Sequence, residues 1–450
     1  MKIKGILSSF ACLYALNAIA SEDKINFIII NCDDMGYGDL SCFGNPSIKT
    51  PNLDLLSLQG QKWTNFYVSS SVSSPSRAGL MTGRLGIRTG MYGNRNGVLF
   101  PNSPEGLPES EITIAELLKS VGYNTACIGK WHLGHTEKYL PLNHGFDYFY
   151  GFPFSNDMSK KEQSLLGNPD YPYEYILYEQ NNILEKEPDQ HYLTKKITSA
   201  AVKYIASHKE SPFFLYLAHP MPHVPVYASD EFLGKSVRGR YGDAVEEIDW
   251  SVGAIMECLK NNGLKDNTLI VFTSDNGPWL IYEQEGGSSG PLKDGKGTHY
   301  EGGFRVPCII WGNMVDSGHI TEVGSTLDIL PTFCDIAGIK LSKKVKFDGH
   351  SLLNVLKDKN EHSDRKYFYY YIGNKLCAIR KGKYKLDLLS KSSSGLYKLF
   401  DLGVDPGERY DISEQNKEIV FELLNDANKF DCSVEKKESI FDKGILKWNE

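Results

Sequence analysis

The stretch INFIIINCDDMGYGDL, residues 25–40, predicts a buried strand that ends in two acidic residues. Its first part is a short apolar run rich in β-branched residues, which is typical of a core strand. A second stretch, TLIVFTSDNG at residues 268–277, repeats this order of an apolar run followed by polar side chains. Open α/β sheets bind their ligands at the carboxyl ends of parallel strands. We therefore expect the polar residues after both runs to lie at one edge of a sheet, namely Asp33, Asp34, Asp275 and Asn276.

Strand-like runs alternate with helical patterns over most of the chain. Apolar residues at helical spacing predict a helix over 111–120, which Gly122 ends, and a longer helix over 241–259. Further strands are expected at residues 125–128, 212–217 and 306–311. Strands that alternate with helices favour a parallel α/β sheet.

The pattern changes near residue 364. Three short strand-like runs, KYFYYYI, CAIRKGKYKLDLL and LYKLFDL, precede a helix expected near residues 418–430. This order predicts a small antiparallel C-terminal subdomain. Before it, the polar, Tyr-rich segment 156–198 has weak periodicity and is expected to be a functional surface loop.

Composition excludes several classes of protein. The chain has 450 residues, of which 41% are hydrophobic and 23% charged, with a mean hydropathy of -0.34, and these values are near the globular average. No run reaches the roughly 18 apolar residues that a membrane span needs. The net charge of -7 argues against a nucleic-acid partner, because nucleic-acid binders usually carry a basic excess. An anionic substrate would have to be captured by local cations.

The first twenty residues have the features of a secretory signal peptide. Lys2 and Lys4 precede an apolar run, and small residues occupy the two cleavage positions, Ala18 and Ala20. We therefore expect a secreted or periplasmic protein whose mature chain begins near residue 21. Cys12 keeps a lipid anchor open as an alternative. The other eight cysteines are widely spaced and lack a CxxC pair, so neither a disulfide framework nor a zinc site is expected.

The most specific element is SVSSPSRAGLMTGR, residues 71–84. It combines Ser73, Pro75, Ser76 and Arg77 with Thr82 and Gly83 at fixed spacing. A (Ser/Cys)-x-Pro-Ser-Arg match arises by chance in about one such chain per hundred, and the added Thr-Gly lowers this to roughly one in tens of thousands. The simpler interpretation is a Ser-rich turn with a helix N-cap, and we expect that local geometry as well.

This segment resembles the modification motif of the type I sulfatases, in which the first Cys or Ser is oxidised to formylglycine. Here that position is Ser73, the serine-type form that a radical maturation enzyme converts in bacteria. Four further segments resemble sulfatase motifs in the family's order: GKWHLG at 129–134, SDNG at 274–277, GKGTHYEGGFRVP at 295–307 and FDLGVDPGERYDIS at 400–413. The resemblance thus covers about residues 26–413.

The resemblance implies both fold and domain organisation. A type I sulfatase is expected to be an α/β protein, an alkaline-phosphatase-like sandwich with a large mixed, mainly parallel sheet. A small C-terminal antiparallel sheet with a helix is expected beside it. We therefore expect a catalytic sulfatase domain over 21–362 and an α+β subdomain over 363–450.

The resemblance also implies the roles of individual residues. The calcium ligands would be Asp33, Asp34, Ser73 in its modified form, Asp275 and Asn276. Arg77 would hold the aldehyde hydrate and the acids near the metal, and the sulfate would be surrounded by Lys130, His132, His223 and Lys296. His219 is a rival for His223, whose His-x-Pro context matches better. Ser155 matches a serine that helps to hold the sulfate in the arylsulfatase A-like branch.

Elementary chemistry supports these roles. A sulfate ester is an anion that repels an attacking oxygen, so a divalent cation with Lys and Arg would neutralise it. Oxygen ligands from Asp and Asn suit calcium or magnesium better than zinc. A serine hydroxyl is a weak nucleophile. A hydrated aldehyde offers two hydroxyls, one to attack sulfur and one whose deprotonation expels sulfate. His223 is the candidate acid for the leaving oxygen, and His132 the candidate for the hydrate's proton.

The substrate is predicted from weaker similarities. Residues 97–119 and 177–198, with the context of Ser155, resemble the arylsulfatase A and N-acetylgalactosamine-6-sulfatase branch. This favours an exo-acting sulfatase for galactose or N-acetylgalactosamine 6-sulfate in mucin or glycosaminoglycan. Candidate sugar contacts are Tyr92, Asn94, Arg95, His299, the tyrosines Tyr171, Tyr173 and Tyr175, and residues 283–287.

Two other functions remain open at this stage. A phosphate or phosphonate ester hydrolase could use the same fold and cations, and it would keep Ser73 as plain serine. A catalytically silent glycan-binding homologue would bind sulfated glycans and release no sulfate.

Overall fold

The computed structural model describes residues 24–444 of the chain. The expected signal peptide over 1–20 and the alternative lipid anchor at Cys12 lie outside the described residues, so both stay predictions. Within residues 24–444, no helix combines the length and the apolar character needed to cross a bilayer. The eight cysteines of this part are all unpaired.

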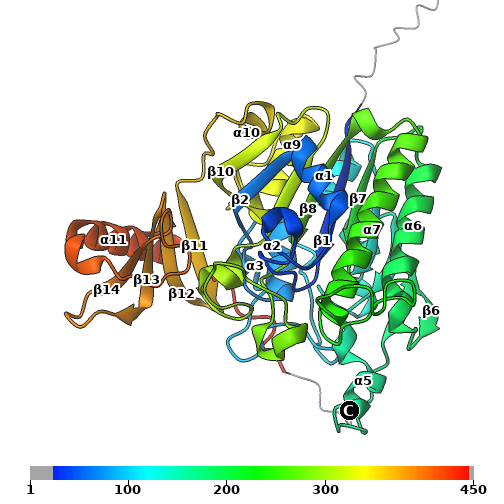
Figure 1. The fold of residues 1–450 in the computed structure, drawn as a ribbon, viewed down its shortest axis with the longest axis horizontal. Coiled ribbons are helices and arrows are strands. Elements are labelled where there is room, and N and C mark those ends of the chain that lie inside the picture. The colour runs from blue at the N-terminus through cyan, green and yellow to red at the C-terminus, as the bar shows by residue number, and fades with distance from the viewer. Residues whose placement is uncertain (1–23, 445–450) are drawn as a thin grey trace, which may run out of the picture.

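A ten-stranded sheet forms the centre of the molecule, in the order β10-β2-β9-β8-β1-β7-β3-β4-β5-β6 (Figure 1). The strands are β1 (Asn26–Cys32), β2 (Gln61–Tyr67), β3 (Asn124–Lys130), β4 (Tyr148–Phe152), β5 (Ile176–Glu179), β6 (Asn182–Lys186), β7 (Phe213–Ala218), β8 (Thr268–Ser274), β9 (Cys308–Trp311) and β10 (Gly318–Ser325). Strands β8, β1, β7, β3 and β4 are neighbours and all parallel. The expected mixed, mainly parallel sheet is confirmed.

Helices cover both faces of this sheet, which explains the unbroken apolar run in β1. Phe27 and Ile29 belong to the core under α2 (Ser73–Thr82), α4 (Ile114–Ser120) and α9 (Ile329–Ile336). Ile28 and Ile30 point to the opposite core, under α1 (Pro51–Gln59), α6 (Leu193–Ser207) and α7 (Arg240–Asn261). A strand buried on both faces cannot alternate apolar and polar residues. The remaining helices are α3 (Gly86–Thr89), α5 (Lys160–Leu165), α8 (Glu301–Phe304), α10 (Leu353–Lys357) and α11 (Lys417–Ser433).

The segment 156–198 differs from the expected loop. It contains α5, the antiparallel hairpin β5–β6 and the start of α6, and the hairpin extends the edge of the large sheet. The hairpin turns at Gln180, whose φ is +57°. Most residues of β6 are exposed, so the strand carries no alternating pattern that would have predicted it.

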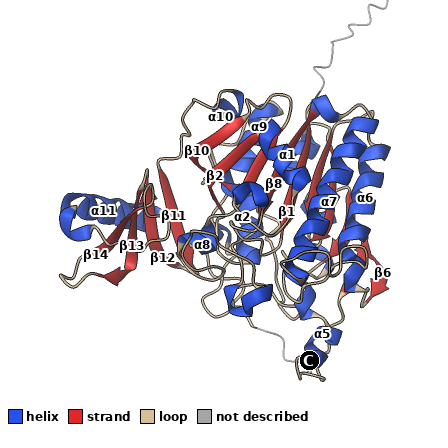
Figure 2. Ribbon diagram, viewed as in Figure 1, coloured by secondary structure: helices blue, strands red, loops and turns tan. Residues whose placement is uncertain are grey.

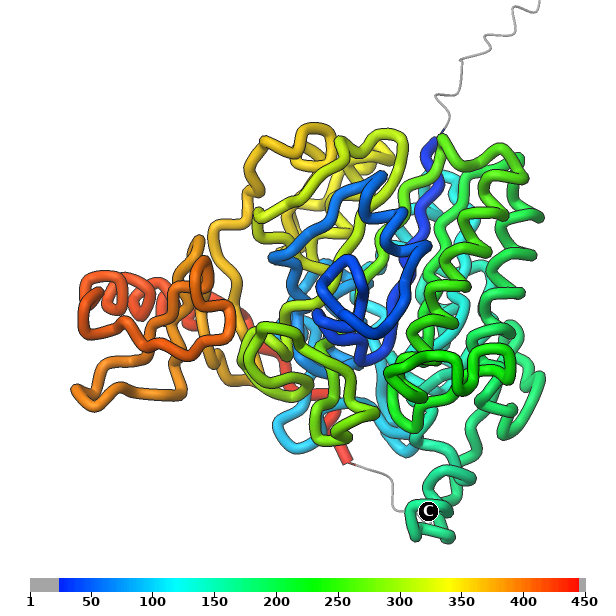
Figure 3. Tube along the Cα trace, in the orientation of Figure 1, coloured from blue at the N-terminus to red at the C-terminus, as the bar shows by residue number. Residues whose placement is uncertain are grey.

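The C-terminal part forms a second sheet, β11 (Tyr367–Ile372), β12 (Lys375–Lys381), β13 (Tyr384–Lys391) and β14 (Tyr397–Asp401). All neighbouring strands are antiparallel, and α11 packs on one face (Figure 2). The expected small antiparallel sheet with a helix is confirmed, while the domain boundary after residue 362 stays a prediction. After α11 the chain returns to the main body (red in Figure 3), where the Lys437 N–H donates to the Ile87 carbonyl oxygen in α3 and the Ile440 N–H to that of Gly90 just after it.

A buried ion cluster joins the two sheets. Glu301 in α8 accepts hydrogen bonds from Tyr67 of β2 at 2.5 Å and Tyr370 of β11 at 2.7 Å. Lys385 of β13 binds Glu301 at 3.1 Å and Glu408 at 2.9 Å, and these charged side chains have no exposed surface. Burial lowers the pKa of Lys385, but Glu408 and Glu301 outweigh it and hold that pKa above its usual value.

Replacing Lys385 by Met should lower the free energy of unfolding by about 3–5 kcal/mol, because two buried carboxylates lose their common cation. Their carboxyls would then bind protons more tightly in the folded state than in the unfolded chain. The decrease in the free energy of unfolding should therefore be largest near about pH 8 and smaller near about pH 5, as measured by urea denaturation at both pH values. Lys383→Met removes an exposed partner of Asp401 and should cost less than about 1 kcal/mol. An equal effect of both substitutions would contradict the structural role of the cluster.

Candidate active site

Three carboxylates meet at the carboxyl ends of two adjacent strands. Asp33 and Asp34 follow β1, and Asp275 follows β8, whose Ser274 is paired with Cys32 in parallel register. The three side chains are buried, and each offers an oxygen within 4.8 Å of the others. The sequence-based expectation that these acids lie together is confirmed.

This cluster has the chemistry of a hard-cation site. Asn276 is also buried there, and its side-chain nitrogen donates to Asp34 Oδ1 at 2.7 Å. Three carboxylates and an amide oxygen form an all-oxygen donor set, which fits calcium or magnesium. Close burial of several acids is unfavourable without cations to offset their charge. The residues present therefore fit a divalent metal ion, and the choice of calcium is considered below.

Burial and nearby cations shift the pKa values of two of these acids in opposite directions. Burial alone would raise the pKa of Asp33, but Lys130, His223 and Arg77 outweigh it and hold that pKa well below its usual value. For Asp275, burial raises the pKa, and the opposing charges of Arg77 and Lys130 do not cancel this effect. The site thus keeps Asp33 ionised by ion pairing rather than by contact with water.

Ser73 is the first residue of α2, and its side chain faces the acid cluster. Its hydroxyl donates to Asp33 Oδ1 at 3.2 Å and lies 3.4 Å from Asn276 Oδ1. Val72, in an extended conformation, precedes the helix and gives it no side-chain cap. The free backbone N–H groups and the helix dipole at this end favour a negative charge beside Ser73.

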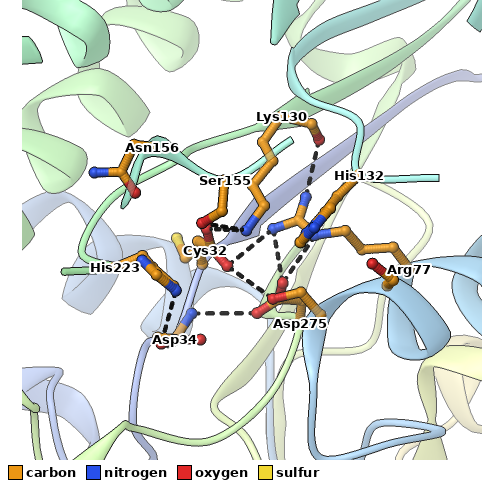
Figure 4. Close-up of polar contacts among 12 residues, drawn as sticks. Cys32, Asp34, Arg77, Lys130, His132, Ser155, Asn156, His223 and Asp275 are labelled. Carbon is orange, nitrogen blue, oxygen red and sulfur yellow. Dashed lines mark hydrogen bonds and ion pairs between the residues drawn. The ribbon is translucent and has the colours of Figure 1, made fainter. Parts of the chain in front are cut away.

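Arg77, one turn further along α2, connects the acids to the sheet. Its guanidinium contacts Asp275 Oδ2 through Nη2 at 2.7 Å and through Nε at 2.8 Å, and lies 3.4 Å from Asp33. Nη1 donates to the Lys130 carbonyl oxygen at 2.9 Å and to the Tyr216 hydroxyl at 3.3 Å. Because every one of these groups is buried, Arg77 is held in one orientation (Figure 4).

Two lysines and Ser155 flank the acids on other elements. Lys130, the last residue of β3, binds Asp33 Oδ2 at 2.5 Å and the Ser155 hydroxyl at 3.2 Å, and the two side chains point toward one another in Figure 4. Lys296 binds Asp34 Oδ2 at 2.8 Å and lies 4.2 Å from the ring centre of Trp279. Burial lowers the pKa of Lys130, whereas at Lys296 the charge of Asp34 outweighs burial and raises the pKa.

The two histidines after β7 have different surroundings. His223 Nε2 lies 3.6 Å from Asp34 Oδ2, so the imidazole faces the acid cluster (Figure 4). His219 instead contacts Ser251 of α7 at 3.4 Å, and burial lowers its pKa to about 3. This geometry favours His223 over its rival, while its catalytic role stays a prediction.

His132 lies beside the same cluster in a strained backbone conformation, with φ at +59°. Its Nε2 donates to the Leu99 carbonyl oxygen at 2.9 Å, and its buried Nδ1 has no partner within residues 24–444. Burial lowers the pKa of His132 well below its usual value, and the positive charge of Lys130 lowers it further. The ring is therefore neutral, with a free nitrogen lone pair inside the site.

Four residues suggested as sugar contacts bind other parts of the chain, and among residues 24–444 none of them makes a hydrogen bond or ion pair with the acid cluster. The Tyr92 hydroxyl donates to the Lys437 carbonyl oxygen at 2.8 Å. The backbone N–H groups of Asn94 and Arg95 donate to Asp442 at 2.8 and 3.0 Å. His299 binds Asp387 of β13 at 3.2 Å. Sugar binding by Tyr92, Asn94, Arg95 and His299 stays a prediction.

The tyrosines of the 156–198 segment differ from one another. Tyr175 has no exposed surface and stacks on Phe152, with 4.6 Å between the ring centres. The suggestion that Tyr175 stacks on a sugar is therefore wrong, since both the ring and its neighbour belong to the core. Tyr171 and Tyr173 pack edge to face at 5.5 Å. For these two, and for residues 283–287 beside Trp279, the suggestion stays open.

Sequence reasoning missed the support behind Arg77. The Tyr216 hydroxyl of β7 accepts hydrogen bonds from Arg77 and, at 3.2 Å, from the side chain of Asn31 in β1. Tyr216 lies within an apolar strand and Asn31 at the end of another, so no motif distinguishes them. Only the pairing of β1 with β7 brings them together.

Comparisons with known proteins agree with this geometry. The family described as Sulfatase matches residues 25–339, and the family described as N-sulphoglucosamine sulphohydrolase, C-terminal, matches residues 294–430. The mouse N-acetylgalactosamine-6-sulfatase is 39% identical over 90% of this chain and 85% of its own. Human arylsulfatase A is 37% identical over 86% of this chain and 83% of its own. The crystal structure of Ps i-CgsB in complex with k-i-k-neocarrahexaose has a TM-score of 0.80 and 32% identity, covering 92% of this chain and 94% of its own.

Replacing Tyr216 by Phe should lower the free energy of unfolding by about 1–3 kcal/mol, because the Asn31 amide loses its buried acceptor. Tyr175→Phe is the matched control, since the buried Tyr175 hydroxyl has no partner within residues 24–444. Its removal should leave stability nearly unchanged or raise it slightly. Chemical denaturation measures the free energy of unfolding of both variants. Equal stability of the two would contradict a supporting role of the Tyr216 hydroxyl for Asn31 and Arg77.

Proposed function

This chain belongs to the sulfatase family and is a sulfuric ester hydrolase, and we propose that it removes the 6-sulfate of galactose or N-acetylgalactosamine from a mucin or glycosaminoglycan, at chain ends. One observation carries the mechanism: Ser73 contacts the buried acid cluster at the start of a helix, and Lys130 and Lys296 flank it. The similarity to mammalian N-acetylgalactosamine-6-sulfatases supports the choice of sugar. A periplasmic or secreted location fits such a substrate.

Fixed positive charge would bind the sulfate. A sulfate ester keeps its negative charge at any physiological pH, so attack on sulfur needs cations around the anion. Lys130 and Lys296 come from different elements and are each bound to a different carboxylate of the acid cluster. Arg77, with its charge held in place by Asp275, contributes a third cation. Ser155 offers a hydroxyl next to Lys130.

Two groups would complete this chemistry. Asp33, Asp34, Asp275, Asn276 and the modified Ser73 would hold a calcium ion, which supplies a Lewis acid for a sulfate oxygen. Oxidation of Ser73 by a radical maturation enzyme would supply an aldehyde hydrate in place of a weakly nucleophilic hydroxyl. In both cases the chain's own role is to fix these positions through β1, β8 and α2.

The histidines would move protons at defined atoms. His223 Nδ1 donates to the Val224 carbonyl oxygen at 2.5 Å, which leaves Nε2 facing the site. From there a protonated His223 can donate to the leaving alcohol oxygen. The neutral His132 keeps a free Nδ1 lone pair, which would accept a hydrogen bond from a hydroxyl of the hydrate. Its lowered pKa makes it a weak base, so its role would be to direct the hydrate's proton.

A panel of sulfated monosaccharides that differ in ring position tests the substrate. We expect kcat/KM for galactose or N-acetylgalactosamine 6-sulfate to exceed that for the 3- and 4-sulfates by at least about tenfold, since a wrongly placed sulfate misses the fixed cations.

Modification of Ser73 is tested by mass spectrometry. Activity should follow the fraction of protein whose Ser73 peptide has lost two hydrogens. Ser73→Ala should lower kcat by at least about a thousandfold. Unmodified Ser73 in fully active protein, with faster turnover of phosphate monoesters, would favour the phosphatase alternative.

Calcium removal tests the metal. Dialysis against a calcium chelator should abolish most activity and lower Tm, and added calcium should restore both, because the buried carboxylates then lose and regain their counter-ion. Calorimetric titration should show weaker calcium binding in Asp275→Asn. Asp39→Asn is the matched control: burial raises the pKa of Asp39 to about 7, so a neutral side chain is well tolerated there. Unchanged calcium affinity in Asp275→Asn would remove that residue from the ligand set.

A further inference from the structure

Trp279 contacts two of the residues expected around the sulfate, yet it has no role in the mechanism described so far. It follows the SDNG segment after β8 and is half-buried. The Lys296 ammonium lies over the indole, 4.2 Å from the ring centre. On another part of the same ring, the centre of the His223 imidazole lies 5.5 Å from the indole centre. One aromatic side chain thus touches both a candidate sulfate-binding cation and the candidate general acid.

Lys296 and His223 approach the same carboxylate oxygen. Lys296 Nζ lies 2.8 Å from Asp34 Oδ2, and His223 Nε2 lies 3.6 Å from it, as Figure 4 shows for the histidine. The two side chains come from separate segments, one after β7 and one before α8. Within residues 24–444 no hydrogen bond joins them to each other. Trp279 touches both, so its ring can fix how they lie relative to one another.

The position of Trp279 is itself fixed by its neighbours. The Pro278 carbonyl oxygen accepts the Lys296 N–H at 2.9 Å, which ties the two segments together. The Trp279 carbonyl oxygen accepts the Tyr282 N–H at 3.1 Å, and the Tyr282 ring packs edge to face on the indole at 4.8 Å between ring centres. The indole also packs against the core on the α7 side of the sheet. It therefore offers a fixed surface to the groups that it touches.

A fixed ring face can hold a lysine in place. The electrons above an aromatic ring attract an ammonium, and this attraction is strongest where water is excluded. The Lys296 side chain is only 9% exposed. Asp34 is also a candidate metal ligand, so its charge is shared, whereas the ring attracts the ammonium independently of any metal. A lysine held on two sides needs no further ordering when the sulfate arrives, and such preorganised charge is what stabilises a transition state.

We propose that Trp279 is a positioning residue for sulfate ester hydrolysis, whose ring holds the Lys296 ammonium and the His223 imidazole side by side next to Asp34. The proposal rests on the proposed function, since it takes the roles of Lys296 and His223 from it. Trp279 acts through these two residues and does not touch the reacting atoms. Its removal should therefore affect both the binding of the sulfate group and the protonation of the leaving oxygen.

Binding of inorganic sulfate tests the hold on Lys296. Sulfate is the product and is not turned over, so calorimetric titration can use the intact enzyme with calcium present. We expect Trp279→Leu to weaken sulfate binding about 3- to 30-fold, and Trp279→Phe, which keeps a ring face, to stay within about twofold of wild type. Trp250→Leu is the matched control, because this half-buried ring of α7 also carries a lysine, Lys195 at 5.8 Å, outside the acid cluster. It should leave sulfate binding unchanged.

A double-mutant cycle separates positioning from a general loosening of the loop. Lys296→Met removes the ammonium that the ring would hold. In that background, Trp279→Leu should change sulfate affinity by less than about twofold, because the interaction between the two residues is already lost. A ring that only supports its own loop would weaken binding by the same factor in both backgrounds.

The leaving group tests the hold on His223. A sugar 6-sulfate releases an alkoxide that needs a proton, whereas 4-nitrophenyl sulfate releases a stable anion that does not. Trp279→Leu should therefore lower kcat for the sugar sulfate about tenfold more than kcat for the aryl sulfate. Trp279→Phe should restore most of this difference. An equal decrease with both substrates would remove His223 from the proposal.

Several outcomes would overturn the positioning role of Trp279. They are wild-type sulfate affinity in Trp279→Leu, equal losses in Trp279→Leu and Trp279→Phe, equal factors in both backgrounds of the cycle, and no sulfate binding by wild type. Thermal unfolding shows that each variant is folded, and Trp279→Met takes the place of Trp279→Leu if the latter does not fold. If wild type cleaves neither galactose nor N-acetylgalactosamine 6-sulfate while Trp279→Leu still loses sulfate affinity, the proposed function fails and the role of Trp279 stands.

Discussion

Mutual repulsion among Asp33, Asp34 and Asp275 is the constraint on which the rest of this structure depends. Burying three carboxylates within a few ångströms is unfavourable unless cations surround them. Separate elements supply these cations: Arg77 comes from α2 and Lys130 from the end of β3, while Lys296 comes from the loop before α8. The elements must therefore dock accurately before the cluster is tolerated, and the same arrangement gives a buried all-oxygen donor set that fits a divalent metal ion.

The C-terminal sheet takes part in this arrangement. The segment that carries Lys296 continues into α8, where Glu301 binds Tyr67 of the large sheet and Lys385 of the small one. The ion cluster around Lys385 thus fixes one end of the loop that brings Lys296 to the acids. A subdomain that lies outside the catalytic cluster can in this way determine the position of Lys296.

Global charge is a poor guide to the ligand of this protein. A chain with a net charge of -7 concentrates fixed cations around one buried site, and part of its acidity consists of the candidate metal ligands themselves. The distribution of charge over elements, rather than its sum, decides where an anion can bind.

The sequence by itself determined the parallel core strands, the acids that follow β1 and β8, and the Ser73 motif at the start of α2, because apolar periodicity and local spacing are properties of short segments. Only the tertiary structure decided which groups support Arg77, that Tyr175 lies in the core, that the hairpin β5–β6 extends the sheet, and that Asp442 binds the backbone at Asn94. Each of these depends on contacts between residues far apart in the chain, or on partly exposed strands that lack a periodic pattern. Such contacts are set by how complete elements pack, so no local pattern contains them.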